Sequence, residues 1–387
     1  MEAYLDYNST TPLDPLVLEA MKPYLVDAFG NASSFHKKGQ KSRHAVEGAR
    51  ETIADALGVE PGDIIFTSGG TESDNLAIKG TLEGLSGKRN HLVVSSIEHQ
   101  AVLHSAQVLE KKGMCVTYLP VDADGLVDLN VLKESISENT ALVSLMHVNN
   151  ETGTIQPIHE AARLAHKKGA LFHTDAVQSF GKIKPGAEEA GADMISVSAH
   201  KICGPKGAGA LYIRKGIKVK AMIHGGHQEK NVRPGTENVA AITGFGKTVE
   251  LAFKYGPEES QRVAGLREKL HRGLQKAVPD LKLNSHPQKR IYNTLNVSFP
   301  GLDGETLLIN FDLRNIYVST GSACTAGSVE PSHVLLAMGL SEKLARAAIR
   351  FSLGRFTREE EISYALTEIP PMVERLRSAS TQNPKSK

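Results

Sequence analysis

Short apolar segments alternate with helix-like segments between about residue 60 and residue 215, and this alternation constrains the fold more than any other feature. The apolar segments are rich in β-branched residues, which is typical of buried strands. Strand and helix in alternation imply right-handed crossovers and a mostly parallel sheet covered on both faces. We therefore predict an α/β fold whose large domain has a mostly parallel seven-stranded sheet. The predicted strands are 64–67, 92–97, 115–119, 141–147, 170–174, 194–198 and 210–213, and helices are predicted at 101–112, 128–137 and 158–168.

The second half of the chain lacks this dense alternation. After a glycine-rich segment at 225–235, two long helices are predicted at 237–254 and 260–278. A chain of 387 residues is longer than a single core usually serves. We predict a large domain over 14–255 and a smaller α+β domain formed by 1–13 and 256–387. The smaller domain is predicted to contain strands at 291–299, 315–319 and 348–353 and helices at 305–312, 332–338 and 359–376.

Composition excludes several functional classes. The 45 basic and 43 acidic side chains nearly balance, so no electrostatic footprint for nucleic acid is present. No apolar run approaches the roughly 20 residues that span a bilayer, and the N-terminus lacks the pattern of a secretory signal. The three cysteines at 115, 203 and 324 are too widely spaced to indicate a disulfide framework or a structural metal site. A cytoplasmic protein with no bound metal is the expectation.

Two of the predicted strands lead into ionisable side chains, Asp175 after 170–174 and Lys201 after 194–198. Ligands of such folds bind at the carboxyl ends of the strands. Desolvation there disfavours an ammonium, so the lysine can act as a neutral amine that forms a Schiff base with an aldehyde cofactor. A carboxylate can hold a pyridinium nitrogen protonated. Each residue alone is more often an ordinary surface charge, but together they suggest pyridoxal phosphate (PLP).

Other polar segments also follow predicted strands. The segment 68–75, Ser-Gly-Gly-Thr-Glu-Ser-Asp-Asn, opens a helix, and Gly70 and Thr71 are placed to bind a phosphate, although a plain helix cap would look similar. The segment matches no Walker or dinucleotide motif. His99 can stack on a flat cofactor and move protons. Asn150 is placed to donate to a ring oxygen or a substrate carboxylate.

Two further residues stand out in the second half of the chain. Cys324 lies in a loop of small residues, Gly-Ser-Ala-Cys-Thr-Ala-Gly, which suits a nucleophile that must swing, although an incidental cysteine is the simpler alternative. Arg350 lies within a predicted strand, where burial requires a partner, and a carboxylate is the obvious one. That carboxylate could belong to the substrate or to the protein.

Taken in order, these motifs resemble the cysteine desulfurases of the NifS/IscS type, fold-type I PLP enzymes related to class V aminotransferases. No single motif is decisive, but the ordered set is highly specific and covers nearly the whole chain. The matching segments are 4–12, 30–36, 68–75, 98–102, 147–153, 173–179, 198–209, 225–239, 321–327 and 350–357.

The resemblance implies how PLP is bound. Lys201 would form the Schiff base and later move the substrate α-proton, while Asp175 pairs with the pyridine nitrogen. Gln178 would contact the ring hydroxyl, and His99 would stack on the ring. A neighbouring subunit would lend Thr236, which implies a homodimer. The phosphate would be held by Thr71, Ser198, His200 and that Thr236.

The resemblance also implies the substrate, L-cysteine. Arg350 and Asn150 would clamp its carboxylate, and Cys324 would attack its sulfur and become a persulfide. The sulfur would then pass to acceptor proteins, such as an iron–sulfur scaffold, or to the thiolation of tRNA or cofactors. Three alternatives stay open: a class V aminotransferase, which does not need Cys324, a selenocysteine lyase, and a non-catalytic sulfur-transfer scaffold. A zinc hydrolase is disfavoured because no His-Glu-x-x-His spacing occurs.

Overall fold

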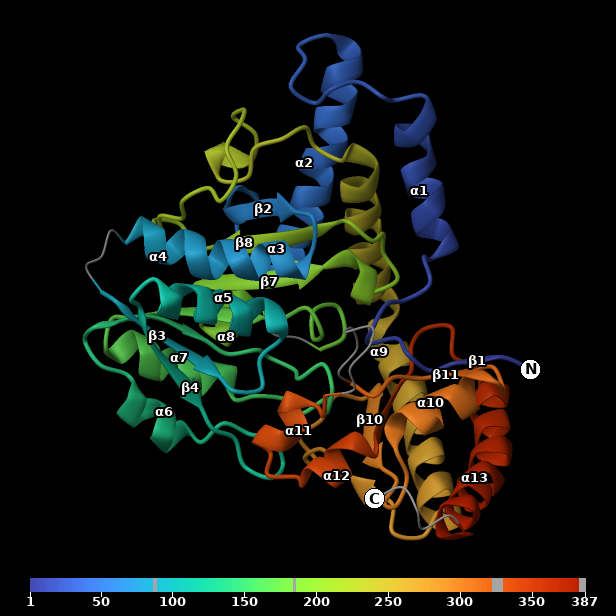
Figure 1. The fold of residues 1–387 in the computed structure, drawn as a ribbon. Helices are drawn as coiled ribbons and strands as arrows, with labels where there is room; N and C mark the ends of the chain where they lie inside the picture. The colour runs from blue at the N-terminus through green and yellow to red at the C-terminus, as the bar shows by residue number, and fades with distance from the viewer. Residues whose placement is uncertain (86–88, 184–185, 322–329, 383–387) are drawn as a thin grey trace.

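The central element of the protein is a seven-stranded sheet with the strand order β2-β8-β7-β6-β5-β3-β4 (Figure 1). The computed structural model describes residues 1–85, 89–183, 186–321 and 330–382. β8 is antiparallel to both of its neighbours and every other pair in this sheet is parallel, which confirms the mostly parallel sheet. Its strands are β2 (Ile64–Thr67), β3 (His91–Ser95), β4 (Cys115–Leu119), β5 (Thr140–Ser144), β6 (Leu171–Asp175), β7 (Met194–Ser198) and β8 (Gly209–Ile213).

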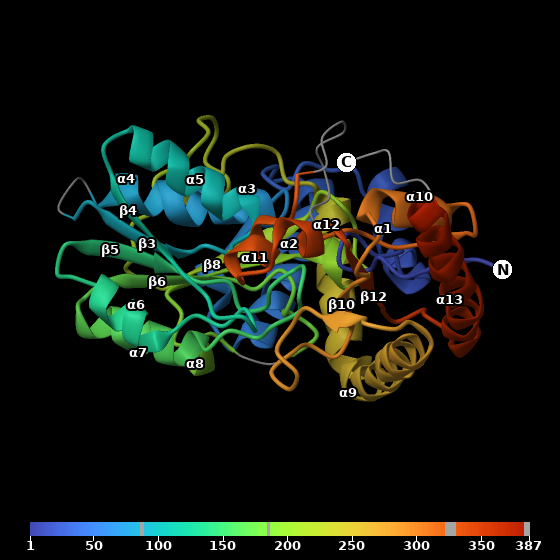
Figure 2. The same cartoon turned by 60° about the horizontal axis from the view of Figure 1, so that its bottom comes forward.

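Helices cover both faces of this sheet, as Figure 2 shows. Successive side chains on a strand point to opposite faces. On β3, for example, Val93 packs with one set of helices, whereas Leu92 and Val94 pack with the other. The first set comprises α2 (Lys37–Leu57), α6 (Leu129–Ser135), α7 (Ile158–Lys167), α8 (Ala187–Ala190) and the start of α9 (Val239–Ala277). The second set comprises α4 (Thr81–Gly84), α5 (Gln100–Lys111) and the π-helical turn Leu76–Gly80, which follows α3 (Gly70–Asn75).

The two long helices predicted at 237–254 and 260–278 are wrong, because the structure has one helix there, α9 (Val239–Ala277). Pro257 lies inside it and removes one backbone donor, which is why the sequence favoured a break. Apolar side chains that pack at both ends of α9 stabilise the helix by more than the missing hydrogen bond costs. Side chains such as Phe245 pack against the large sheet, whereas Leu270 and its neighbours pack in a second core.

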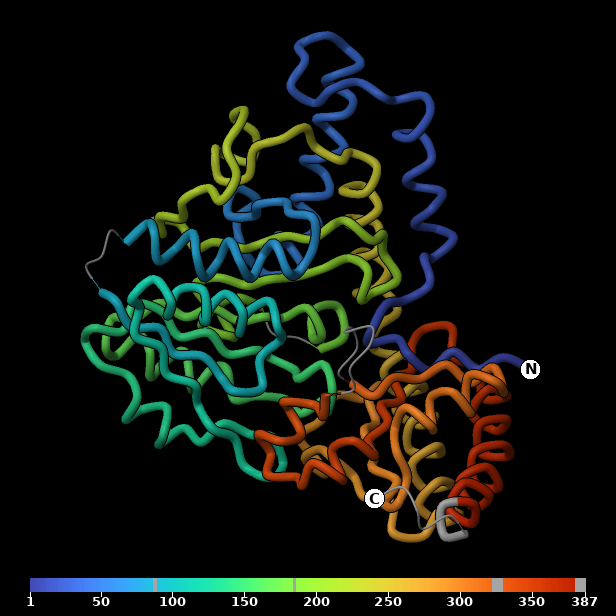
Figure 3. The backbone as a smooth tube through the Cα atoms, in the orientation of Figure 1, coloured from blue at the N-terminus to red at the C-terminus, as the bar shows by residue number. Residues whose placement is uncertain are grey.

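The second core lies in the C-terminal part of the chain, together with the first residues of the chain (Figure 3). β1 (Ala3–Tyr4) pairs in parallel with β11 (Ile316–Tyr317), and a separate antiparallel sheet has the order β12-β10-β9. The change of core near residue 255 supports the predicted division into domains, which stays a prediction. The remaining elements are α1 (Pro15–Val26), β9 (Lys282–Leu283), β10 (Thr294–Ser298), α10 (Gly304–Asp312), α11 (His333–Ala337), α12 (Glu342–Arg346), β12 (Ala348–Ser352) and α13 (Glu359–Gln382).

Candidate active site

Polar side chains from several loops meet in one cavity at the carboxyl ends of the parallel strands. Its volume is about 310 Å³, at the lower end of the range typical of small-molecule sites. This edge of the sheet is where ligands of such folds bind. The predicted site residues that line this cofactor cavity are Gly70, Thr71, His99, Asn150, Asp175, Gln178, His200, Lys201 and Arg350.

Lys201 ends a short turn directly after β7. Its Nζ donates hydrogen bonds to the backbone carbonyl oxygens of Asn8, at 2.6 Å, and Ser9, at 2.9 Å. Burial, and after it the cations of Arg350 and Lys182, lowers the pKa of Lys201 to about 7. A large fraction of this amine is therefore unprotonated near neutral pH, which is the form that reacts with an aldehyde.

Asp175 and His99 lie in the same cavity at the ends of β6 and β3. Asp175 is buried, and its Oδ1 accepts a hydrogen bond from the backbone N–H of Val177 at 2.8 Å. Burial raises the pKa of this carboxyl, while His99 and Lys201 oppose that effect. His99 caps α5, since its Nδ1 accepts from the backbone N–H of Ala101 at 3.1 Å. Burial lowers the pKa of His99, which favours the neutral ring that stacks on an aromatic cofactor.

A shallower hollow adjoins this cavity at Gly70, Thr71 and His200, which line both. Ser198 also lines the hollow, and its buried Oγ has no hydrogen-bond partner among the described residues. Gly70 begins α3, and a Cβ at that position would lie 2.7 Å from Cγ2 of Val177. A free hydroxyl, a threonine and the first amides of a helix are the donors that a phosphate group takes.

The side chains that line the cofactor cavity and the adjoining hollow therefore fit PLP. A nucleophilic amine, a buried carboxyl and an unsatisfied hydroxyl are present for the aldehyde, the pyridine nitrogen and the phosphate, respectively. A pyridinium beside Asp175 would stabilise the ionised form of a carboxyl that burial otherwise disfavours.

Arg350 is buried on β12, and its partners are protein groups. One terminal nitrogen, Nη2, donates to Asp6 Oδ1 at 2.9 Å and to Ser9 Oγ at 2.7 Å. The other, Nη1, donates to the backbone carbonyl of Asn150 at 3.0 Å. Its Nε is buried without a hydrogen-bond partner in the described part of the chain. A protein carboxylate thus satisfies part of the guanidinium, and Arg350 also lines the cavity.

Sequence reasoning missed several residues of this site. Asp74 lines the cavity, and burial, followed by the charge of Asp175, raises its pKa well above the usual value. Glu98 is fully buried, with Oε1 accepting from the backbone N–H of Met146 at 2.8 Å. Asn8 supplies the carbonyl that binds Lys201. The only signal in the sequence was their location in motifs already singled out. Asn8 lies in the segment 4–12, Asp74 lies in 68–75, and Glu98 precedes His99.

Two predicted site residues, Cys324 and Thr236, stay predictions. Cys324 falls in 322–329, outside the described residues. Thr236 is exposed and does not line the cavity of its own chain, so its assignment depends on a second subunit. Of the other cysteines, Cys115 is exposed and Cys203 is buried, and burial raises the pKa of Cys203 to about 11. The Cys203 thiol is therefore protonated near neutral pH.

Two other features, a metal site and a membrane-spanning helix, are absent from the described ranges. No group of three or more histidine, cysteine and acidic side chains there could hold a metal ion. No helix in the same ranges is both long and apolar enough to cross a membrane.

Comparison with known proteins gives matches along nearly the whole chain. The model of the family described as aminotransferase class-V matches residues 3–365. A cysteine desulfurase IscS of Dictyoglomus turgidum is 50% identical over 379 residues, which cover 98% of this chain and 96% of that protein. A solved NifS-like protein superposes with a TM-score of 0.92 at 40% identity, covering 97% of this chain and all of that one.

A second solved structure, described as SspA in complex with cysteine, has a TM-score of 0.82 and 40% identity, and covers 92% of this chain and 100% of its own. These matches agree with the ordered motifs and with the sheet that carries the cavity. The chain belongs to the class-V aminotransferase family and, within it, to the cysteine desulfurases of the NifS/IscS type.

Proposed function

We propose that the protein is a PLP-dependent cysteine desulfurase that converts L-cysteine to L-alanine and keeps the sulfur as a persulfide on Cys324. One observation carries the proposal: Lys201, Asp175 and Arg350, from three different elements, line a single cavity at the carboxyl edge of the sheet. A relative named cysteine desulfurase, 50% identical over nearly the full length, supports the same activity.

The proposed roles at the cofactor follow from the positions of the side chains. Lys201 would hold the aldehyde carbon, Asp175 the ring nitrogen and Gln178 the ring hydroxyl, with His99 against the ring. Thr71, Ser198 and His200, with the backbone at Gly70, would hold the phosphate, joined by Thr236 of a second subunit in a homodimer. PLP, when bound, withdraws electrons from the substrate and makes its Cα proton acidic.

Arg350 and Asn150 are the proposed contacts of the substrate carboxylate. Arg350 lines the cavity, and its guanidinium can share a substrate carboxylate with Asp6. Once its amine is free, Lys201 is placed to take the Cα proton, since burial and nearby cations keep much of it unprotonated near neutral pH. His99 is the second residue proposed to hold or move a proton.

Cys324 is the proposed sulfur acceptor. Its thiolate attacks the sulfur of bound cysteine, an S–S bond forms, and the C–S bond breaks with its electron pair left on the substrate carbon. That carbon then takes a proton and becomes the methyl group of alanine. The persulfide sulfur passes to acceptor proteins, for which an iron–sulfur scaffold or a thiolation pathway in the cytoplasm is our proposal.

The test is a product analysis with the purified, PLP-loaded protein. With L-cysteine and a thiol reductant, alanine and sulfide should form in equal amounts without an added keto acid. Alanine formation that requires a keto acid would instead identify an aminotransferase. A much higher kcat/KM for selenocysteine than for cysteine would identify a selenocysteine lyase. Absence of turnover with a correctly folded, PLP-loaded protein would leave the sulfur-transfer scaffold.

A further inference from the structure

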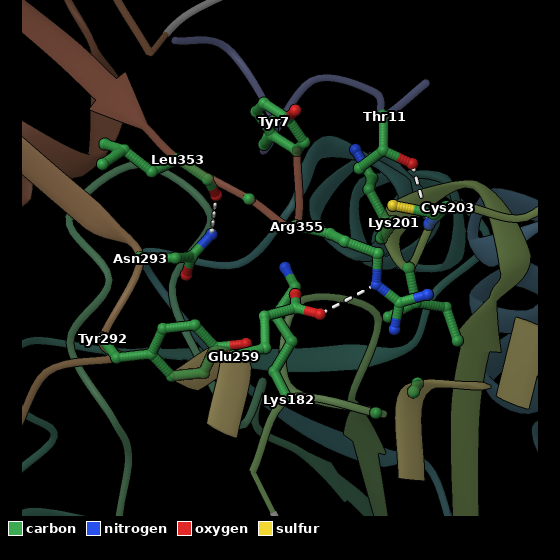
Figure 4. Close-up of a pocket in the computed structure, with 14 residues that line it drawn as sticks. Tyr7, Thr11, Lys182, Lys201, Cys203, Glu259, Tyr292, Asn293, Leu353 and Arg355 are labelled. Carbon is green, nitrogen blue, oxygen red and sulfur yellow. Dashed lines mark hydrogen bonds and ion pairs between the residues drawn. The ribbon is translucent and has the colours of Figure 1, made fainter. Parts of the chain in front are cut away.

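A second, smaller cavity adjoins the cofactor cavity at Lys201. Its volume is about 30 Å³, and Figure 4 shows the charged and polar side chains that point toward it. Lys201 lines both this inner cavity and the cofactor cavity. The inner cavity is large enough for about one or two water molecules. Its other polar lining residues include Tyr7, Thr11, Lys182, Cys203, Glu259 and Arg355.

Hydrogen bonds connect Lys182 to Lys201 through two neutral groups. Lys182 Nζ donates to Oε1 of Gln178 at 3.2 Å, and Nε2 of the same amide donates to the backbone carbonyl of Asn8 at 3.0 Å. That carbonyl also accepts the 2.6 Å hydrogen bond from Lys201 Nζ. The two amines therefore share one short network, and the amide of Gln178 is held with its nitrogen toward the side of Lys201.

The carboxylate in the inner cavity is already paired. Glu259, on α9, accepts a 2.8 Å hydrogen bond from Nε of Arg355, whose Nη1 also bonds Asp14 at 2.9 Å. The hydrogen bond that Lys182 donates goes instead to an uncharged oxygen. The positive charge of Lys182 is thus only partly balanced, and it acts on the other groups that face the cavity.

Charged groups of both signs act on the two lysines. Burial lowers the pKa of Lys182 to about 8; the Cys203 position and Glu259 oppose this effect, and Arg350 adds to it. The Cys203 thiol itself stays protonated near neutral pH. Burial lowers the pKa of Lys201 to about 7. The groups that act on Lys201 are the cations Arg350 and Lys182 and the anions Asp175 and Asp6.

We propose that Lys182 is a positioning residue for Lys201: across the inner cavity it carries the positive charge of the pair, so that Lys201 presents an unprotonated amine to the cofactor and the substrate. A cation beside a lysine disfavours a second charge on it. The proposal rests on the proposed function, because only a reaction that uses the free amine of Lys201 needs this arrangement.

The test measures the protonation of Lys201 directly, in full-length protein freed of PLP. Trace acetic anhydride acylates unprotonated amines, and mass spectrometry quantifies the label on the peptide that contains Lys201 as a function of pH. In the wild type the labelling midpoint should lie at about pH 7. Lys182→Met should raise it by about one pH unit, which means about tenfold less label on Lys201 near neutral pH.

Three matched variants separate charge from structure. Lys182→Gln, a second neutral replacement, should raise the midpoint as Lys182→Met does, and it covers the case in which the methionine variant does not fold. Lys182→Arg keeps the charge and should keep the wild-type midpoint. Lys215→Met, at an exposed lysine, should leave the midpoint unchanged. An unchanged midpoint in both neutral variants, with wild-type circular dichroism, would overturn the proposal. So would an equal rise in Lys182→Arg, because that result would assign Lys182 a purely structural role.

The labelling result does not depend on turnover. If the wild-type midpoint and its shift are as expected but cysteine yields no alanine, the desulfurase proposal fails and the charge effect of Lys182 stands. If alanine forms but the midpoint does not move, this inference alone fails.

Discussion

Arg350→Ala removes a buried guanidinium that ties Asp6 and Asn150 together and that we propose to receive the substrate carboxylate. Losing one partner of a buried charge-assisted contact costs about 2 to 4 kcal/mol. If the substrate makes that contact, kcat/KM for L-cysteine should fall by about 30- to 900-fold, mainly through KM. PLP content should not change, because Arg350 is not among the proposed phosphate contacts.

A second variant shows whether the loss comes from the substrate or from the fold. Asp6→Asn removes the carboxylate that shares the guanidinium and keeps a side chain of the same size. The Asp6 side chain is 20% exposed and that of Arg350 only 3%, so the ion pair is partly buried and losing its charge costs about 1 to 3 kcal/mol. Without it, Arg350 binds the substrate carboxylate with less competition, and KM should fall by about two- to fivefold.

The assay is steady-state alanine formation at several cysteine concentrations, with PLP content and urea unfolding measured on each variant. If Arg350 binds the substrate carboxylate, the two variants should move KM in opposite directions. If Asp6→Asn and Arg350→Ala both lower kcat/KM to a similar extent, or if both lose PLP, then Arg350 is a structural tie between the N-terminal segment and the Asn150 loop. It would then not be a substrate clamp.

Three other changes give separate tests. Cys324→Ala should keep PLP uptake but lose sulfide release, and mass spectrometry should no longer show one added sulfur on the peptide that contains residue 324. Cys203→Ala, at a buried protonated thiol, should keep sulfide release and the added sulfur on the Cys324 peptide. A persulfide on Cys203 would refute the assignment. Lys201→Ala should abolish turnover and the visible absorption of the PLP-loaded protein, and a fully active variant would exclude it as the base. Burial lowers the pKa of His173 to about 3, so below about pH 6.5 the unfolded chain binds a proton on this histidine that the folded chain does not. The free energy of unfolding should therefore fall by about 1.4 kcal/mol per pH unit in that range. His173→Asn should flatten this slope in urea unfolding, and an unchanged slope would contradict the prediction.

The sheet and the cofactor residues could be predicted from the sequence because each depends on local signals. The limits of β2, β4 and β7 match the predicted segments, since each apolar run ends at a turn that contains polar, proline or glycine residues. Asp175 and Lys201 follow two such strands, and topology alone brings strand ends together. Pro257 shows the opposite case, because a local helix breaker is outweighed by packing at both ends of α9.

The rest of the site depends on contacts between distant segments. Whether Arg350 pairs with a substrate or with the protein is decided by Asp6, which is 344 positions away in the sequence. Lys182 lies in a glycine-containing turn with no recognisable motif, and only its hydrogen bond to Gln178 reveals its position. Glu98 and Asp74 are buried carboxyls, a state that composition and periodicity do not predict for acidic residues.

The pairing of β1 with β11 has a consequence for folding during synthesis. Ala3 leaves the ribosome first, yet its partner Ile316 is made more than 300 residues later. At 5 to 20 residues per second, the N-terminal segment waits roughly 15 to 60 s for that partner. Its Asn8 and Ser9 carbonyls, which bind Lys201, lack the support of that strand pair until then. The large sheet can form earlier, so a nascent chain should hold a folded sheet with an unfinished cofactor cavity until the last strands emerge.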